Sequence, residues 1–347
     1  MNSLRNEIQQ LRGVSILAVL CFHLYPSTFK NGFLGVDVFF VISGYLITKQ
    51  LVAADSRSFA TYLSNFYFRR LKRIIPSAIS IVLLTLLATY FLLGIVTFVQ
   101  NLDDAKWANL FLANWFYLHQ NLNYFATGNI NLFQHYWSLA IEEQFYLFWP
   151  LILFFNKRNW AIPLIIFSAS LWLYLNASYP SNFYSTTNRV WELLSGALLV
   201  LLPVRQSSKL GPIFPIVLMI FLLLPLNISP KGSTILIVFA TSIYIAAAKE
   251  VSFKGPLYAL GQISFTLYLV HFPIIKIYDD LNSSDQPIMR AISIFAVITL
   301  ATLLNYKFIE NKFRYRHYRD PKTLIFGTSI TLVLIEVILI SLKGYYV

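Results

Sequence analysis

Apolar segments of about 20 residues recur along nearly the whole chain, each long enough to cross a hydrocarbon core about 30 Å thick as a helix. They predict eleven membrane-spanning helices, at residues 11–27, 36–54, 76–99, 137–155, 160–176, 189–203, 211–227, 232–248, 256–276, 288–308 and 323–342. The long connection from 100 to 136 is rich in Asn and aromatic residues, so we expect it to fold back on the membrane as short helices. The pattern therefore predicts an all-α, polytopic transmembrane helical bundle.

Composition and charge placement support this prediction. Of the 347 residues, 57% are hydrophobic and 12% are charged, whereas about a quarter of a typical globular protein is charged. The net charge of +12 could suggest nucleic-acid binding, but most of the 27 Lys and Arg residues fall in alternate loops, on the side that holds the N-terminus. Because cytoplasmic loops carry an excess of these residues, we expect a cytosolic N-terminus, an odd number of spans and no nucleic-acid partner.

The first apolar segment is predicted to be a membrane anchor that is retained in the mature protein. It ends in His23-Leu24-Tyr25-Pro26, which lacks the small residues of a signal-peptide cleavage site. The single cysteine, Cys21, excludes an intramolecular disulfide and reads as a small core residue.

Ionisable side chains inside spans are costly and by default mark a functional interior. Arg12 lies at the inner mouth of the first span, and His23, eleven residues later, lies about 16 Å further along the helix axis. Asp37 opens the second span from the outer side. The first two spans thus place an imidazole and a carboxylate in the outer half of the bundle, and a guanidinium at the inner end.

Later spans add further polar groups to the outer half. Glu142 and Glu143 lie in the fourth span, where neighbouring residues point about 100° apart, so both cannot face one cavity. Arg189 and Glu192 share one helix face at the outer start of the sixth span. His271 lies near the outer end of the ninth span.

A basic run leads into the third span on the inner side. Its cations are Arg69, Arg70, Lys72 and Arg73. This cluster could seat the phosphates of a nucleotide, although such a run alone is ordinarily a topogenic signal that contacts lipid headgroups. Each intramembrane group likewise has a structural alternative, such as a packing histidine or an ion pair. Their combination favours a functional site.

Several segments, in order, resemble the acyltransferase-3 family of membrane-bound acyltransferases. They are Leu11-Arg12-Gly13 through His23, Gly35 to Thr48, Arg69-Arg70 with Arg73-Ile74 and Pro76, Trp137 to Leu147, Arg189 with Glu192 to Gly196, Ile263 to His271, and Glu310 with Phe313-Arg314. The resemblance covers residues 5 to about 316. It implies a ten-helix acyltransferase domain at 1–320, and an extra C-terminal helix with a short outer tail at 321–347.

The resemblance implies an enzyme, an acyltransferase of the bacterial inner membrane. It would move an acyl group, commonly acetyl, from cytosolic acyl-CoA to a hydroxyl of a cell-envelope glycan such as O-antigen, lipopolysaccharide or an exopolysaccharide. Acetyl-CoA would be the donor substrate, with no permanently bound cofactor and no metal. In the family an extra helix usually leads to a fused extracytoplasmic domain, so either this protein transfers directly or a separate extracytoplasmic transferase completes the reaction.

The resemblance also implies a role for each polar group. The catalytic residues would be His23, as general base or transient acyl carrier, with Asp37 or Glu142 holding its tautomer; the acyl-CoA-binding residues would be Arg12, Arg69, Arg70 and Arg73; the acceptor entrance would be lined by Arg189, Glu192 and His271. In the family's Glu-x-Gln-Phe-Tyr pattern the first glutamate is the constant one, which favours Glu142 over Glu143. We expect these side chains to converge in one water-accessible channel.

Two other classes of protein remain as alternatives. Buried charges also line transport paths, so the chain could be a transporter or flippase of a lipid-linked sugar, although the sequence lacks the internal repeat common in transporters. The third possibility is a non-catalytic membrane scaffold. The intact set of Arg12, His23, Asp37 and Glu142 argues against it, because burying charges inside a membrane is costly.

Overall fold

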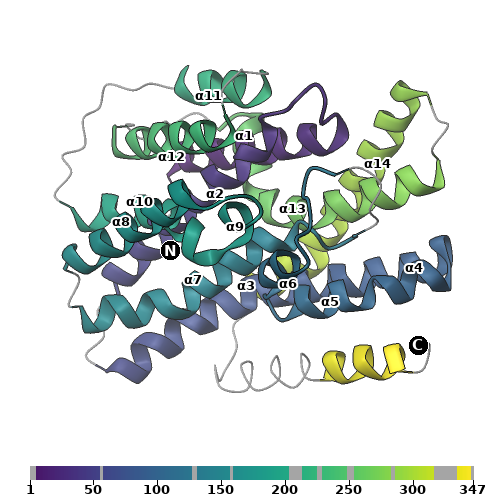
Figure 1. Ribbon diagram of the computed structural model, residues 1–347, viewed down its shortest axis with the longest axis horizontal. Helices are drawn as coiled ribbons and strands as arrows, with labels where there is room; N and C mark the ends of the chain where they lie inside the picture. Colours follow the sequence, from purple (N-terminus) through teal and green to yellow (C-terminus); the bar gives the residue numbers. More distant parts are fainter. Residues whose placement is uncertain are drawn as a thin grey trace. The chain divides into compact units, whose positions relative to one another are not determined.

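The computed structural model describes residues 5–54, 58–126, 131–156, 159–202, 213–224, 229–247, 254–282, 286–315 and 334–344. The regular elements of these residues are all helical (Figure 1). They are α1 (Asn6–Leu24), η1 (Gly32–Leu34), α2 (Gly35–Val52), α3 (Phe59–Ala88), η2 (Thr89–Leu93), α4 (Ile95–Gln100), α5 (Leu102–Asn109), α6 (Ala113–His119), α7 (Tyr136–Phe155), α8 (Ala161–Asn176), α9 (Ser181–Tyr184), α10 (Thr186–Leu201), α11 (Ile213–Leu223), α12 (Pro230–Ala247), α13 (Pro256–Leu281), α14 (Pro287–Asn305), η3 (Tyr306–Glu310) and α15 (Asn311–Tyr315). Residues 334–344 are also helical. The predicted all-α class is confirmed.

Six helical segments in the described part of the chain are long and apolar enough to cross a membrane. They are Gly32–Val52, Phe59–Leu93, Tyr136–Phe155, Pro230–Ala247, Pro256–Leu281 and Pro287–Tyr315. Each overlaps one of the predicted spans, and the shorter apolar helix α8 overlaps another. The total of eleven spans stays a prediction, since α10 and α11 are shorter and part of 323–342 lies outside the described residues.

The helix that contains the predicted third span begins well before residue 76. Helix α3 begins at Phe59 and continues through Pro76. A proline inside a helix removes one backbone hydrogen bond without necessarily ending the helix. The basic run therefore lies on α3 itself, where helical spacing decides which of its cations share a face.

The connection from 100 to 136 contains short helices, α5 and α6, as expected. Between them, Phe111 has a left-handed backbone with φ of 54°. Nε2 of Gln144 donates to the carbonyl oxygen of Phe111 and to Oδ1 of Asn114, each at 2.9 Å. The Gln144 amide on α7 thus holds this strained turn in place.

The described chain separates into two compact units. Unit 1 comprises residues 1–54 and 145–265, and unit 2 comprises 55–144 and 266–347. Helix α7 enters unit 1 at Phe145, and helix α13 enters unit 2 at Thr266.

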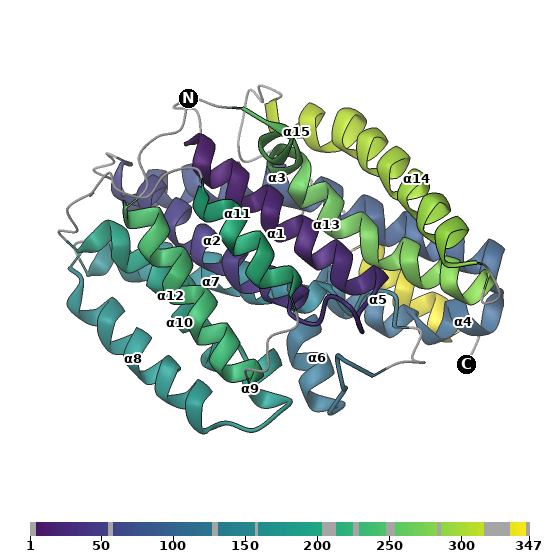
Figure 2. The same ribbon diagram turned by 90° about the horizontal axis from the view of Figure 1, so that it is seen from above.

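In unit 1, α2 packs directly against α10. A Cβ placed on Gly44 would lie 1.7 Å from the carbonyl oxygen of Leu193, and one on Gly196 would lie 1.9 Å from that of Val41. Only glycine fits at these two positions, so the motif glycines of both helices permit backbone-to-backbone contact. Helix α8 packs on α10, and α11 runs beside α1 (Figure 2).

In unit 2, polar side chains join helices far apart in sequence. Nδ2 of Asn305 donates to Oγ of Ser80 at 2.8 Å, and the Tyr136 hydroxyl donates to the carbonyl oxygen of Ala78 at 3.1 Å. Oγ1 of Thr266 donates to the buried carboxylate of Glu310 at 2.6 Å. These contacts tie α3 to the end of α14, α7 to α3, and α13 to the end of η3.

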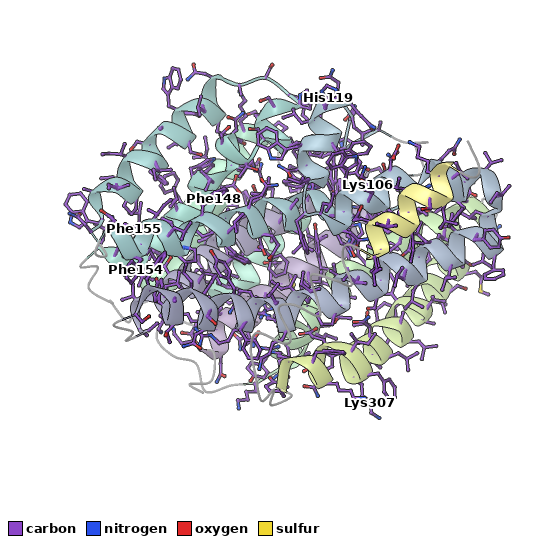
Figure 3. The ribbon with its side chains drawn as sticks, turned by 90° about the horizontal axis from the view of Figure 1, so that it is seen from below. Lys106, His119, Phe148, Phe154, Phe155 and Lys307 are labelled. Carbon is purple, nitrogen blue, oxygen red and sulfur yellow. The ribbon has the colours of Figure 1, made fainter. Side chains whose placement is uncertain are left out.

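Large apolar side chains cover much of the outer surface. Phe148 and Phe155 of α7 project from the ribbon, 59% and 70% exposed (Figure 3). Phe91 of η2 is 77% exposed and Ile288 of α14 is 74% exposed. Soluble monomers rarely expose apolar surface on this scale, which fits a lipid-facing exterior.

Candidate active site

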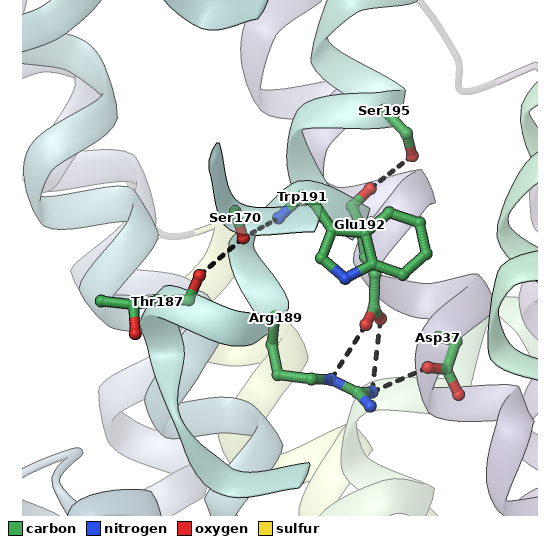
Figure 4. A network of polar contacts seen from close by, with 7 residues as sticks. All are labelled: Asp37, Ser170, Thr187, Arg189, Trp191, Glu192 and Ser195. Carbon is green, nitrogen blue, oxygen red and sulfur yellow. Dashed lines mark hydrogen bonds and ion pairs between the residues drawn. The ribbon is translucent and has the colours of Figure 1, made fainter. Parts of the chain in front are cut away.

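A buried ion-pair cluster joins α2 to α10 inside unit 1 (Figure 4). Nη2 of Arg189 donates to Oδ1 of Asp37 at 2.7 Å, and Nε of Arg189 lies 2.9 Å from Oε1 of Glu192. The three side chains are 3%, 1% and 0% exposed. One guanidinium thus serves two carboxylates, and the cluster has a formal charge of −1.

Aromatic rings enclose the guanidinium. Its central carbon lies 5.6 Å from the ring centre of Phe40, 5.7 Å from that of Phe183 and 6.0 Å from that of Tyr174. Cations are attracted to aromatic faces, and the attraction is strongest where water is excluded. The rings come from α2, α9 and α8, so Arg189 is held by the three elements that surround it.

Hydrogen bonds around the first turns of α10 fix the start of this helix. Oγ of Ser170, on α8, donates to the carbonyl oxygen of Thr187 at 2.6 Å and accepts from the backbone N–H of Trp191 at 3.0 Å (Figure 4). Ser170 thus bridges the carbonyl oxygen and the N–H of two residues that are four apart in the first turns of α10. Residues 189 and 192 are therefore positioned by backbone contacts as well as by their own ion pair.

His23 lies near the end of α1 and is half-buried. Its Nδ1 lies 2.9 Å from the carbonyl oxygen of Val19, one turn earlier on the same helix. Since a carbonyl oxygen can only accept, Nδ1 carries the hydrogen, and in the neutral ring Nε2 carries the lone pair. The resemblance implied that a carboxylate of Asp37 or Glu142 would hold this tautomer; in the structure Nδ1 contacts the carbonyl of Val19, and Asp37 accepts from Arg189.

Arg12 is buried in α1, 6% exposed. Its Nη2 donates to Oγ of Ser264 at 2.8 Å, and its Nη1 donates to Oε1 of Gln9 at 3.4 Å. Both partners belong to unit 1, because the first turns of α13 lie there. The guanidinium is thereby fixed beside the N-terminal half of α1.

The predicted arginine cluster lies on α3 in unit 2, half-buried. Arg70 and Arg73 are one turn apart and share a helix face. That Glu142 and Glu143 of α7 point to different surroundings, as neighbours about 100° apart on a helix should, stays a prediction.

His271 lies in a second buried network of unit 2, and it is fully buried. Its Nδ1 lies 2.7 Å from the carbonyl oxygen of Tyr268, and its ring centre lies 5.6 Å from that of His135. The Tyr268 hydroxyl donates to the carbonyl oxygen of His135 at 2.7 Å, so Oγ of Ser138, 2.6 Å away, donates to Tyr268. This network fastens the start of α7 to α13.

The structure thus brings Asp37, Arg189 and Glu192 together, and places each other predicted site residue within its own unit. That the predicted site residues of unit 1 and those of unit 2 converge in one channel stays a prediction. The sequence did not indicate a role for Ser264, Tyr268 or Ser138. The Ser264 hydroxyl contacts Arg12, and the hydroxyls of Tyr268 and Ser138 bond to each other, while the carbonyl of Tyr268 contacts His271. All three lie in the motif segments, but serine and tyrosine in an apolar helix read as packing residues. Among the described residues no group of His, Cys, Asp and Glu side chains could hold a metal ion.

The fold and these side chains define the class as a polytopic helical membrane domain with buried Arg, His and carboxylate groups. The profile of the acyltransferase-3 family, described as an acyltransferase domain, matches residues 5–306. The chain belongs to this family. Its helices and its family together make it a multi-pass membrane protein.

Curated relatives agree with the family match. The chain is 31% identical to the peptidoglycan O-acetyltransferase OatA of Listeria monocytogenes, over 89% of this chain and 55% of that protein. It is 30% identical to the O-acetyltransferase OatA of Staphylococcus aureus, over 97% of this chain and 62% of that protein. The chain therefore spans only slightly more than half the length of these relatives. No solved structure matches it significantly.

Proposed function

We propose that the chain is a membrane O-acetyltransferase that moves an acetyl group from cytosolic acetyl-CoA to a hydroxyl of a cell-envelope glycan, in the bacterial cytoplasmic membrane. The observation that carries the proposal is the tautomer of His23, in a chain of the acyltransferase-3 family. With Nδ1 donating to Val19, Nε2 is the basic nitrogen, as a general base requires.

On the donor side, Arg12, Arg69, Arg70 and Arg73 bind the phosphates of acetyl-CoA. Guanidinium groups bind phosphate through paired hydrogen bonds, and they keep their charge at any physiological pH. The cationic face of α3 lies on the side where the distribution of Lys and Arg places the cytosol.

In the chemical step, Nε2 of His23 takes the proton of the attacking glycan hydroxyl. The hydroxyl oxygen bonds to the thioester carbonyl carbon, and the C–S bond breaks to release CoA as a thiolate, which accepts the proton from the imidazolium. Asp37 and Glu142 are the acidic groups that stabilise the imidazolium in this proposal.

On the acceptor side, Arg189, Glu192 and His271 act as positioning groups. Their burial, at 2% or less, means that none of them forms an open entrance in this structure. We propose that the ion-pair cluster keeps α2 and α10 together beside the acceptor path, and that His271 fixes α13 in the same way.

The acceptor is proposed to be a cell-wall glycan, with peptidoglycan the first to test, because the relative from Listeria is named a peptidoglycan O-acetyltransferase. The O-antigen and lipopolysaccharide acceptors that the resemblance suggested have no support from these relatives. A separate extracytoplasmic transferase could still complete the reaction.

The test is the O-acetyl content of purified cell-wall glycan from cells lacking the chain, complemented with wild type or with His23→Gln. Wild type should restore ester-linked acetate, and the variant should not. Restoration by both proteins at equal abundance would contradict the role of His23. Restoration by neither, with loss of glycan export instead, would favour the flippase alternative.

A further inference from the structure

The inner half of α1 packs against the first turns of α13 with almost no space between the backbones. A Cβ added to Gly13 would lie 2.0 Å from the carbonyl oxygen of Leu257, and one added to Gly261 would lie 1.9 Å from that of Gln9. Both contacts lie within about one turn of each helix, Gln9 to Gly13 on α1 and Leu257 to Gly261 on α13. Their relative register is therefore fixed by two glycines.

This register determines what the Arg12 side chain can reach. Helical side chains tilt toward the N-terminus, so the Arg12 guanidinium extends back over the turn that holds Gln9. Ser264 lies three residues after Gly261 on α13, one turn beyond this backbone contact. There Nη2 of Arg12 donates to Oγ of Ser264 at 2.8 Å, and its Nη1 donates to Oε1 of Gln9 at 3.4 Å.

The orientation of the Ser264 hydroxyl suits it to accept from a cation. Its hydrogen is directed at the carbonyl oxygen of Gly261, 3.0 Å away, which leaves the lone pairs of Oγ for Arg12. Ser264 is 1% exposed, so water does not compete for the contact. A hydrogen bond to a buried charged group is among the stronger ones in proteins.

We infer that Ser264 is a positioning residue for donor binding. It holds the Arg12 guanidinium in the orientation that accepts a phosphate group of acetyl-CoA, with Gln9 as a weaker second support. This inference rests on the proposed function, in which Arg12 contacts the donor. Ser264 itself contacts Arg12 and not the reacting atoms.

The experiment is steady-state kinetics of Ser264→Ala in the full chain, with two donors. Acetyl-CoA carries the phosphates, and acetyl-pantetheine lacks them. We expect the KM for acetyl-CoA to rise about tenfold while kcat and the KM for acetyl-pantetheine stay within about twofold. Ser242→Ala is the matched control, since Ser242 is also buried in unit 1 and also donates to a carbonyl of its own helix. It should leave both KM values unchanged.

Two further variants separate the outcomes. Gln9→Met, of nearly equal volume, should raise the KM for acetyl-CoA in the same direction by a smaller factor, and it serves if Ser264→Ala does not fold. In an Arg12→Lys background, Ser264→Ala should add no further rise. An equal effect of Ser264→Ala on both donors, or an effect that persists without Arg12, would overturn the inference alone. No transfer from acetyl-CoA by wild type would instead overturn the proposed function.

Discussion

Nδ1 of His23 lies 2.9 Å from the carbonyl oxygen of Val19, one helical turn earlier on α1. In many catalytic histidines a carboxylate holds this nitrogen. Here a backbone carbonyl of the same helix does so, and this contact places the hydrogen on Nδ1. The carboxylate of Asp37 forms an ion pair with Arg189.

Replacing His23 by glutamine should abolish acetyl transfer while the protein still folds. The amide can keep a hydrogen bond to Val19 but cannot take a proton, and general base catalysis is worth about 10²- to 10⁴-fold. The measurement is the initial rate with acetyl-CoA and a glycan fragment. His119→Gln is the matched control, because His119 is exposed at the end of α6 and should keep the full rate.

Replacing Arg189 by alanine should destabilise the protein by about 3–5 kcal/mol, because it leaves two buried carboxylates without their cation. Arg290→Ala is the control, since Arg290 pairs with Asp279 at the surface, with side chains 20% and 39% exposed, and such pairs contribute about 0–1 kcal/mol. Thermal unfolding in detergent compares the two. Equal losses of stability would contradict the assigned role of the buried cluster.

Replacing Gly44 by alanine should cost about 1–3 kcal/mol, since its Cβ would overlap the backbone of α10 and force the helices apart. Gly344→Ala should cost almost nothing, because a Cβ there meets open space. Denaturation in detergent gives both values. A neutral Gly44→Ala variant would mean that α2 and α10 are not in backbone contact.

Asp104, in the connection between α4 and α7, should make stability depend on pH. Burial raises the pKa of this carboxyl to about 7, while Asn131 donates to it at 2.9 Å. The folded state therefore holds a proton that the unfolded chain releases near pH 4, so this contribution is full below pH 4 and is lost as pH rises toward 7.

Between pH 5 and pH 8 the wild type should lose about 2 kcal/mol through this group, and Asp104→Asn should lack that loss. Thermal unfolding of both proteins at the two pH values gives the comparison. Parallel pH profiles for wild type and variant would show that Asp104 is ionised in the folded protein.

The hydrophobic pattern predicted the helices well where a segment was both long and apolar. Spans 137–155 and 160–176 correspond closely to α7 and α8. It did not predict the first turns of α3, because they carry the basic run and are not apolar enough to belong to a span. Residue spacing placed Arg189 and Glu192 on one helix face, where the structure shows their ion pair.

The partners of the site residues could not be predicted, because they depend on packing between distant segments. Ser264 reaches Arg12 only through the glycine contacts of α1 and α13, and Asp37 reaches Arg189 only because α2 lies on α10. Nothing in the sequence marks Val19 as the partner of His23, since every helical residue offers a carbonyl one turn away. Local periodicity determines helices, while side-chain partners require the tertiary fold.

Transacetylation across a sealed membrane tests the central claim most directly. Purified protein is reconstituted in liposomes that enclose a glycan fragment, and acetyl-CoA with a labelled acetyl group is added outside, to molecules whose basic loops face outward. The account predicts ester-linked label on the enclosed glycan with wild type, and none with His23→Gln. Label on the glycan at equal rates with both proteins, or no label with the wild type, would contradict it.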